Sequence, residues 1–303
     1  MTLRQFARIV EIRTKIISVS GLAIGALLSL YFFPRFFLDR FLIMVAATLC
    51  VDMGTTAFNS FFDYEKGVDS RDSNRESDKV LVHEGVAPGL ALLVAMGLFA
   101  IAAVLGLVLG YLSGWPVVFA GALCMAVGFF YNGGPVPLSS TPAGEVFAGG
   151  FLGTVLILIT VYVAAGELTV RVALATLPSF LLIASILTVN NTCDIEGDTA
   201  GGRLTLSIVV GERASAVLVY VLGALAFGAL IAFGAYGVLP IASAVAGAIG
   251  VIVAFPTYRT MARRGFSHAT KGPSMGAISR VFSIFTGAYC AALIAALIRT
   301  MSV

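Results

Sequence analysis

Residues 41–69 read FLIMVAATLCVDMGTTAFNSFFDYEKGVD. The first two thirds of this stretch are apolar over about 20 residues, the length that a membrane-spanning helix needs. Its end carries Asn59, Asp63, Lys66 and Asp69. Charged side chains are costly in hydrocarbon and are retained there mainly for function. The stretch therefore predicts a membrane helix with a functional site at its end.

The rest of the chain is likewise rich in apolar residues and poor in charged ones. Of 303 residues, 59% are hydrophobic and only 12% are charged, whereas a soluble protein carries about a quarter charged residues. The apolar runs are continuous and do not alternate, which favours helices over a membrane barrel. The sequence predicts one all-α integral membrane domain over residues 1–303, with nine transmembrane helices at about 16–34, 41–61, 89–112, 116–132, 146–165, 170–192, 214–236, 239–258 and 279–298.

Basic residues predict the orientation, because Lys and Arg accumulate on the cytoplasmic side of a membrane. With the N-terminus inside, the outer side keeps only Arg35, Arg40, Arg171 and Arg299 of the 19 basic residues. We therefore expect a multi-pass protein of the cell inner membrane, surrounded by membrane lipid, with its N-terminus and its active site on the cytoplasmic side. Topology accounts for the basic residues, so no nucleic-acid partner is expected.

Acidic residues gather on two of the inner loops. Ten of the 16 Asp and Glu residues follow the second or the sixth span. In the second loop, Asn190, Asp194 and Asp198 are spaced four residues apart, which on a helix places them on one stripe. Asn59 and Asp63 repeat the four-residue step. The repeat predicts an internal duplication, with halves of about 1–132 and 133–303 whose two sites face each other.

These residue types point to a particular ligand. Asp and Asn supply the hard oxygen donors that suit Mg²⁺, which commonly binds one or two carboxylates together with water and substrate phosphates. Lys66 and Arg203 would serve no purpose at a site for a metal cation alone, so the two clusters predict a metal-bridged diphosphate site. The alternative is that the carboxylates are solvated loop charges and helix caps, although capping does not require the same spacing twice.

Three stretches carry a family resemblance: NSFFDYEKGVD at 59–69, YNGGPVPLSSTPAGEVFAG at 131–149 and NNTCDIEGDTAGGRLTL at 190–206. They resemble the intramembrane prenyltransferases of the UbiA superfamily. The form NxxxDxxKGxD is similar to the MenA subfamily, the 1,4-dihydroxy-2-naphthoate polyprenyltransferases. Two positions depart from the subfamily pattern, since Cys193 stands where arginine is common and Arg203 where lysine is common. Arg203 keeps the charge and adds a bidentate donor for phosphate.

The resemblance implies transfer of a polyprenyl group from an allylic polyprenyl diphosphate to an aromatic acceptor. For the naphthoate, the acceptor's carboxylate would be lost and demethylmenaquinol, a menaquinone precursor, would form. The resemblance also implies roles for individual residues. Two Mg²⁺ ions would be held by Asp63, Asp69, Asp194 and Asp198, with Asn59 and Asn190 assisting, and the diphosphate would contact Lys66 and Arg203, with Tyr131 close by.

Asp52 is a further candidate, because it lies two helical turns before Asn59 on the same face of the predicted helix. An acid inside a span is a functional candidate by default, here for orienting or deprotonating the acceptor hydroxyl. The alternative is a buried acid bonded to threonine or backbone. Lys15, at the start of the first span, could reach the diphosphate or serve topology alone, and His268 is expected to be an ordinary surface histidine.

Two other functions stay open. The same superfamily could use another acceptor, such as 4-hydroxybenzoate, homogentisate, haem or chlorin. A multi-span transporter would also contain many spans, glycines and intramembrane acids. Transporters built from repeats place their sites near the bilayer midplane, whereas both acid clusters here lie at the inner ends of predicted helices, which favours the enzyme.

Overall fold

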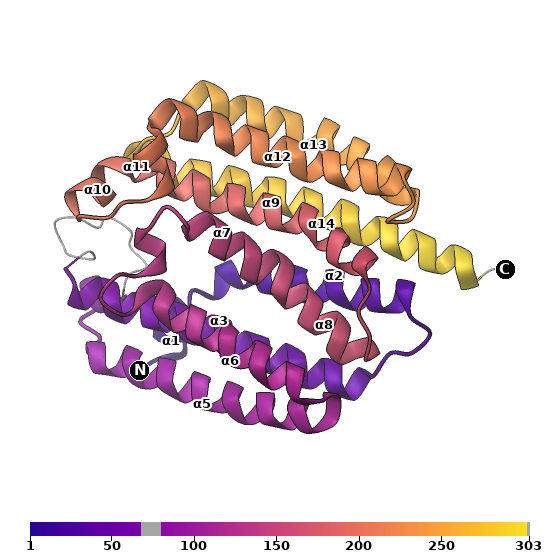
Figure 1. Ribbon diagram of the computed structural model, residues 1–303. Coiled ribbons are helices and arrows are strands. Elements are labelled where there is room, and N and C mark those ends of the chain that lie inside the picture. The colour runs from indigo at the N-terminus through magenta and orange to yellow at the C-terminus, as the bar shows by residue number, and fades with distance from the viewer. Residues whose placement is uncertain (68–79, 302–303) are drawn as a thin grey trace. The chain divides into compact units, whose positions relative to one another are not determined.

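The computed structural model describes residues 1–67 and 80–301, and within these ranges every regular element is a helix (Figure 1). Nine helical segments of the described residues are long and apolar enough to cross a membrane. The prediction of an all-α membrane bundle with nine spans is therefore confirmed. The spans are α2 (Ile16–Phe32), α3 (Leu38–Glu65), α5 (Pro88–Ser113), α6 (Trp115–Asn132), α7 to α8 (Gly144–Ala165), α9 (Val170–Cys193), α12 (Glu212–Ala235), α13 (Ala242–Arg264) and α14 (Lys271–Met301).

Prolines lie in the first turn of α14 and inside α9, and neither ends its helix. The last span was expected from residue 279, but α14 begins at Lys271 with Pro273 in its first turn. Proline is tolerated there because the first amides of a helix have no intrahelical acceptor. Pro178 lies inside α9, which nevertheless continues from Val170 to Cys193. In membranes, neighbouring helices stabilise such interruptions.

The chain forms two compact units, and unit 1 comprises Met1–Val19 and Leu38–Ser139. It contains α1 (Leu3–Ile9), η1 (Ile12–Lys15), α3, α4 (Val80–His83), α5 and α6. Aromatic packing joins its three long helices. Phe58 of α3 is almost fully buried and meets Phe99 of α5 and Phe129 of α6 edge-on, with ring centroids 5.0 and 5.2 Å away. These contacts hold the polar end of α3 against its neighbours.

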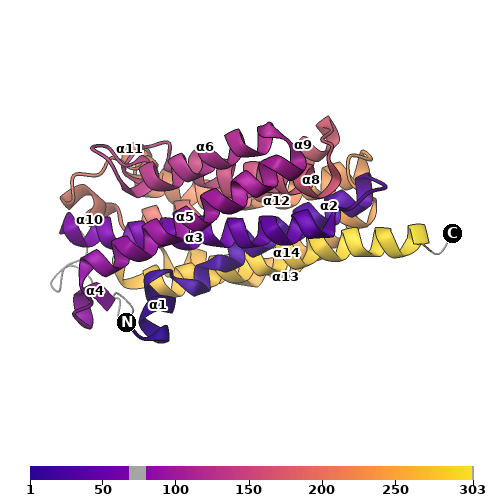
Figure 2. The same ribbon diagram turned by 90° about the horizontal axis from the view of Figure 1, so that it is seen from below.

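Unit 2 comprises Ser20–Phe37 and Ser140–Val303. Its central helix is α9, which packs against α12, α14 and the π-helical segment η3 (Gly149–Val155), while α13 and α14 lie side by side (Figure 2). Tyr289 of α14 is fully buried and donates its hydroxyl to the backbone oxygen of Ala175 at 2.7 Å. Short elements lie at the polar end of α9, namely α10 (Ile195–Ala200), α11 (Leu206–Val210) and η4 (His268–Thr270).

Two glycines allow the α7–η3 segment to approach α9 closely. A Cβ atom on Gly153 would lie 2.6 Å from the backbone nitrogen and Cα of Phe180, and one on Gly149 would lie 2.6 Å from the carbonyl oxygen of Phe180. Contact between helix backbones is the usual role of small residues in membrane bundles. The two glycines therefore let these helical segments pack closely in unit 2.

Candidate functional site

The first motif lies at the end of α3. Asn59 and Asp63 are one helical turn apart and half-buried. The helix ends at Glu65, and Gly67, two residues beyond this end, adopts a positive φ of 72° that suits glycine after a helix C-terminus. Lys66 lies in this terminal turn and is exposed. Asp69, the fourth carboxylate of the predicted metal site, lies outside the described residues.

Lys66 brings the first motif to the end of α6. Its Nζ donates to the backbone oxygen of Asn132 at 3.2 Å and lies 5.5 Å from the centroid of the Phe62 ring. Asn132 is buried and donates from its side chain to the backbone oxygen of Thr55 in α3 at 3.4 Å. Tyr131 precedes Asn132 in the chain. Unit 1 therefore places Lys66 beside the segment that carries Tyr131, two residues that the sequence assigned to one site.

The second motif is interrupted where a continuous helix was expected. Asn190 lies in the last turn of α9, but Asp194 caps that helix with φ −105° and ψ 9°, and Asp198 belongs to the separate short helix α10. The prediction of one unbroken stripe is wrong in this respect. The spacing still brings the groups together, because the amide of Asp194 donates to the backbone oxygen of Asn190 at 3.2 Å and the amide of Asp198 to that of Asp194 at 2.8 Å.

Each of the two aspartates in this motif has a basic neighbour. The Oδ2 atom of Asp194 lies 2.8 Å from Nζ of Lys271, and its Oδ1 lies 3.6 Å from Nδ1 of His268. The Oδ1 atom of Asp198 lies 3.3 Å from a guanidinium nitrogen of Arg203. Burial raises the pKa of Asp198, while the positive charge of Arg203 opposes this effect. Two carboxylates and three basic side chains thus form one cluster within unit 2.

Sequence reasoning identified only part of this cluster. Arg203 was predicted from its place after Asp198, whereas His268 in η4 and Lys271 at the start of α14 were not assigned to the site. His268 is exposed, as expected, but lies beside Asp194. In the sequence, this region stood out only by its basic residues. The preference of Lys and Arg for the cytoplasmic side explained these residues equally well.

The middle stretch, residues 131–149, contacts both motifs, each within its own unit. Its first part meets Lys66 in unit 1, as described above. In unit 2, the amide of Leu204 donates to the backbone oxygen of Ser140 at 2.9 Å, and Asn191 donates to Glu145 at 2.9 Å. That the two motifs are copies of one ancestral half, and that they face each other, stays a prediction.

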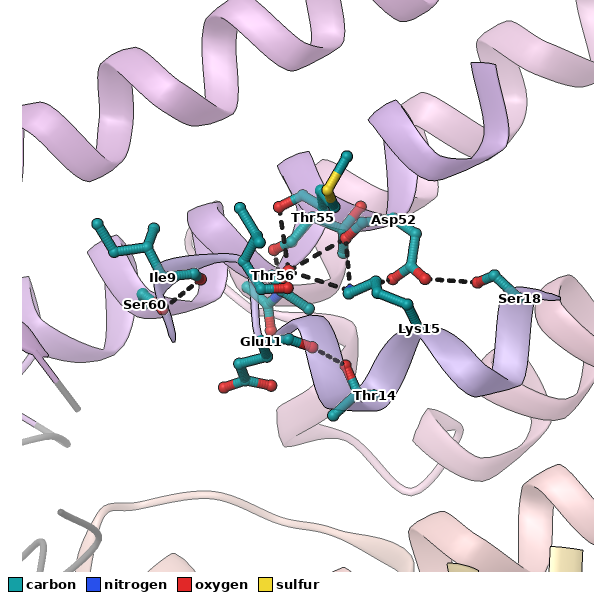
Figure 3. A network of polar contacts seen from close by, with 12 residues as sticks. Ile9, Glu11, Thr14, Lys15, Ser18, Asp52, Thr55, Thr56 and Ser60 are labelled. Carbon is teal, nitrogen blue, oxygen red and sulfur yellow. Dashed lines mark hydrogen bonds and ion pairs between the residues drawn. The ribbon is translucent and has the colours of Figure 1, made fainter. Parts of the chain in front are cut away.

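Asp52 lies in a network of polar contacts within unit 1 (Figure 3). Its Oδ1 atom accepts from Nζ of Lys15 at 2.6 Å and its Oδ2 accepts from Ser18 at 2.5 Å. Lys15 is only 4% exposed and also donates to Thr56 at 3.2 Å. Both carboxylate oxygens of Asp52 are therefore occupied by protein groups, and Lys15 is occupied with Asp52. A role of Asp52 toward the acceptor stays a prediction.

The oxygen donors of the cluster in unit 2 suit a Mg²⁺ ion that also binds a phosphate group. Among the described residues, no group of three or more His, Cys, Asp and Glu side chains is arranged to hold a metal ion by itself. Mg²⁺ does not require such a cage, because it commonly takes one or two carboxylates and fills its remaining positions with water and substrate phosphates. Asp194 and Asp198 supply two carboxylates one turn apart, and the basic side chains beside them suit the phosphate.

Known proteins resemble this chain in sequence and in fold. The model of the UbiA prenyltransferase family matches residues 18–271. The 1,4-dihydroxy-2-naphthoate octaprenyltransferase of Bacillus subtilis (strain 168) is 32% identical over 195 residues, which is 64% of this chain and 62% of that protein. The match thus spans about six tenths of the relative's length.

Solved structures share the fold at low sequence identity. The apo structure of a UbiA homologue from Aeropyrum pernix K1 superposes with a TM-score of 0.68 at 19% identity, covering 95% of this chain and 98% of that one. A UbiA homologue from Archaeoglobus fulgidus, bound to GPP and Mg²⁺, gives a TM-score of 0.63 at 13% identity, with 95% and 99% covered. With a family model that matches most of its length, the chain belongs to the UbiA prenyltransferase family.

Proposed function

We propose that this protein is a Mg²⁺-dependent prenyltransferase that moves a polyprenyl group from an allylic diphosphate to an aromatic acceptor within the membrane. The observation that carries the proposal is the cluster in unit 2, where Asp194 pairs with Lys271 and Asp198 with Arg203. Each carboxylate thus has a cation beside it. Such a mixture of charges suits a ligand that combines a metal ion with an anionic group. Family membership and the homologue bound to GPP and Mg²⁺ support the same ligand.

The chemistry explains why both kinds of side chain are needed. The allylic C–O bond breaks with its electron pair leaving on the diphosphate, so negative charge grows on the phosphate oxygens. Bound Mg²⁺ would neutralise part of this charge. Asp194 and Asp198 would hold the ion, and Lys271 and Arg203 would then be available to donate charge-assisted hydrogen bonds to the phosphate oxygens.

The first motif would act in the same way. Asn59, Asp63 and Asp69 supply oxygen donors and Lys66 supplies the cation, with Tyr131 on the adjacent segment. We propose two Mg²⁺ ions, because the set of donors occurs twice in the chain, with Asn190 as the counterpart of Asn59. The apolar surroundings of the spans would keep water from the allylic cation, which water would otherwise capture.

We propose 1,4-dihydroxy-2-naphthoate as the acceptor, with loss of its carboxylate as the new C–C bond forms, giving demethylmenaquinol for menaquinone synthesis. The NxxxDxxKGxD form of residues 59–69 and the function of the Bacillus subtilis relative support this choice. Another aromatic acceptor remains the alternative within the family. The distribution of basic residues supports an inner-membrane protein with a cytoplasmic N-terminus.

Prenyl transfer by the purified protein in detergent tests the proposal. The assay combines a polyprenyl diphosphate with either 1,4-dihydroxy-2-naphthoate or 4-hydroxybenzoate, with and without Mg²⁺, for the wild type, Asp63→Ala and Asp194→Ala. The proposal expects metal-dependent product from the naphthoate and loss of product in both variants. Product from 4-hydroxybenzoate instead would reject the acceptor. Activity that neither substitution reduces would reject the metal sites, and transport in liposomes would then be measured.

A further inference from the structure

Glu145 is a carboxyl group inside a membrane span that the proposed mechanism does not use. It lies in the first turn of α7 (Gly144–Ala148) and is 3% exposed. Its Oε1 atom accepts a hydrogen bond from Nδ2 of Asn191 at 2.9 Å. Its Oε2 atom is buried, and the described residues offer it no hydrogen-bond partner.

Packing does not explain this side chain. The contact between the α7–η3 segment and α9 is formed by Gly149 and Gly153, whose missing side chains let the two backbones meet. Burying a carboxyl group with one oxygen unsatisfied is costly and calls for a reason. Asp52, a half-buried acid of another span, differs because it is paired with Lys15. Glu145 forms no ion pair with a described residue, so the uncharged acid is the form that its surroundings permit.

The position of Asn191 indicates what the bond does. Asn191 lies between Asn190 and the cap of α9, and the amide of Asp194 donates to the backbone oxygens of both Asn190 and Asn191, at 3.2 and 3.3 Å. The side chain of Asn191 is itself buried. Its bond to Glu145 therefore fixes the turn from which Asp194 extends toward Lys271.

We infer that Glu145 is a positioning residue: as an uncharged acid bonded to Asn191, it holds the last turn of α9 so that Asp194 is presented to the metal and the diphosphate. This inference rests on the proposed function. Groups that orient a metal ligand from behind typically change metal affinity or activity about 10-fold to 100-fold when they are removed.

Two substitutions of Glu145 test the inference, one that keeps the hydrogen bond to Asn191 and one that removes it. Glu145→Gln keeps an acceptor for Asn191 and stays uncharged, whereas Glu145→Leu removes the bond. We expect the KM for farnesyl diphosphate to stay within about twofold of wild type in Glu145→Gln and to rise about 10-fold in Glu145→Leu. The rise in melting temperature that Mg²⁺ with farnesyl diphosphate produces should be kept in the first variant and reduced in the second. Glu212→Leu, at an exposed acid in the first turn of α12, is the matched control and should change neither readout.

A double variant distinguishes positioning from a purely structural role. Replacing both partners of a buried hydrogen bond by apolar groups can be nearly neutral for stability. Glu145→Leu with Asn191→Leu should therefore recover the melting temperature of the ligand-free protein while the KM for farnesyl diphosphate stays high.

Recovery of the KM together with the melting temperature would overturn the inference. An equal rise in the KM for farnesyl diphosphate in Glu145→Gln and Glu145→Leu would overturn it too. The site would then require a negative charge at this position, which glutamine cannot supply. A wild-type protein that neither binds the diphosphate nor transfers its prenyl group would reject the proposed function itself, and the inference with it.

Discussion

Lys271 Nζ lies 2.8 Å from Asp194 Oδ2, although α12 and α13 separate the two residues in the chain. His268 approaches the other oxygen of the same carboxylate. The start of the last span therefore contributes to the second motif. This contact makes the start of α14 part of the candidate diphosphate site and adds a cation that the motifs do not contain.

Lys271→Met should raise the KM for the allylic diphosphate about 10-fold, because a charge-assisted hydrogen bond to phosphate would be lost. The KM for the aromatic acceptor should stay unchanged. Initial rates measured against each substrate check this split. Arg264→Met, at an exposed cation near the end of α13, is the control and should leave both values as they are. An unaltered diphosphate KM in Lys271→Met would show that Lys271 serves only as a partner of Asp194.

Asp198→Asn should lower kcat/KM on the order of 100-fold, because the amide keeps the size of the side chain but cannot neutralise a metal ion. Asp198 is 8% exposed, so its carboxylate is shielded from water and its charge acts strongly on its neighbours. The measurement is prenyl transfer over a range of Mg²⁺ concentrations. Glu196→Gln, at an exposed acid two residues earlier on α10, should behave as wild type. Equal losses in the two variants would argue for general charge in the loop rather than a site at Asp198.

Lys15→Met should destabilise the protein by about 3 kcal/mol, because the Asp52 carboxylate, which is largely shielded from water, would lose its buried cation. Lys15→Met combined with Asp52→Leu should recover most of this loss, since no charge then remains buried. Thermal unfolding in detergent measures both effects. A double variant that is stable but has lost turnover with the aromatic acceptor would support the predicted role of Asp52 in catalysis. Full turnover in that variant would limit the pair to stability.

Gly153→Ala should lower the unfolding temperature, because the added Cβ would meet the Phe180 backbone at 2.6 Å and force η3 and α9 apart. Overpacking of this kind costs about 1–3 kcal/mol. The matched control is Gly150→Ala, whose Cβ would lie 4.0 Å from its nearest neighbour, the Phe180 ring. Thermal unfolding should separate the two variants, and similar midpoints would show that the helices can adjust without cost.

The number and the approximate limits of the spans followed from the sequence, because a helix that crosses a bilayer needs a long apolar run and little else. The placement of Asn59, Asp63 and Asn190 at helix ends followed in the same way, from polar residues that come directly after apolar ones. These are local properties, readable from neighbouring residues. The family could be recognised for the same reason, since its motifs are short stretches of consecutive residues.

Tertiary structure alone decided which distant side chains meet. The pairing of Asp194 with Lys271, of Asp52 with Lys15 and of Asn191 with Glu145 depends on how helices pack and at what register. The break at Asp194 also came from the folded chain, although the four-residue spacing suggested a continuous helix. Periodicity describes one helix at a time, whereas a contact between helices depends on side-chain shape along the whole interface, including the glycines that bring α9 and the α7–η3 segment together.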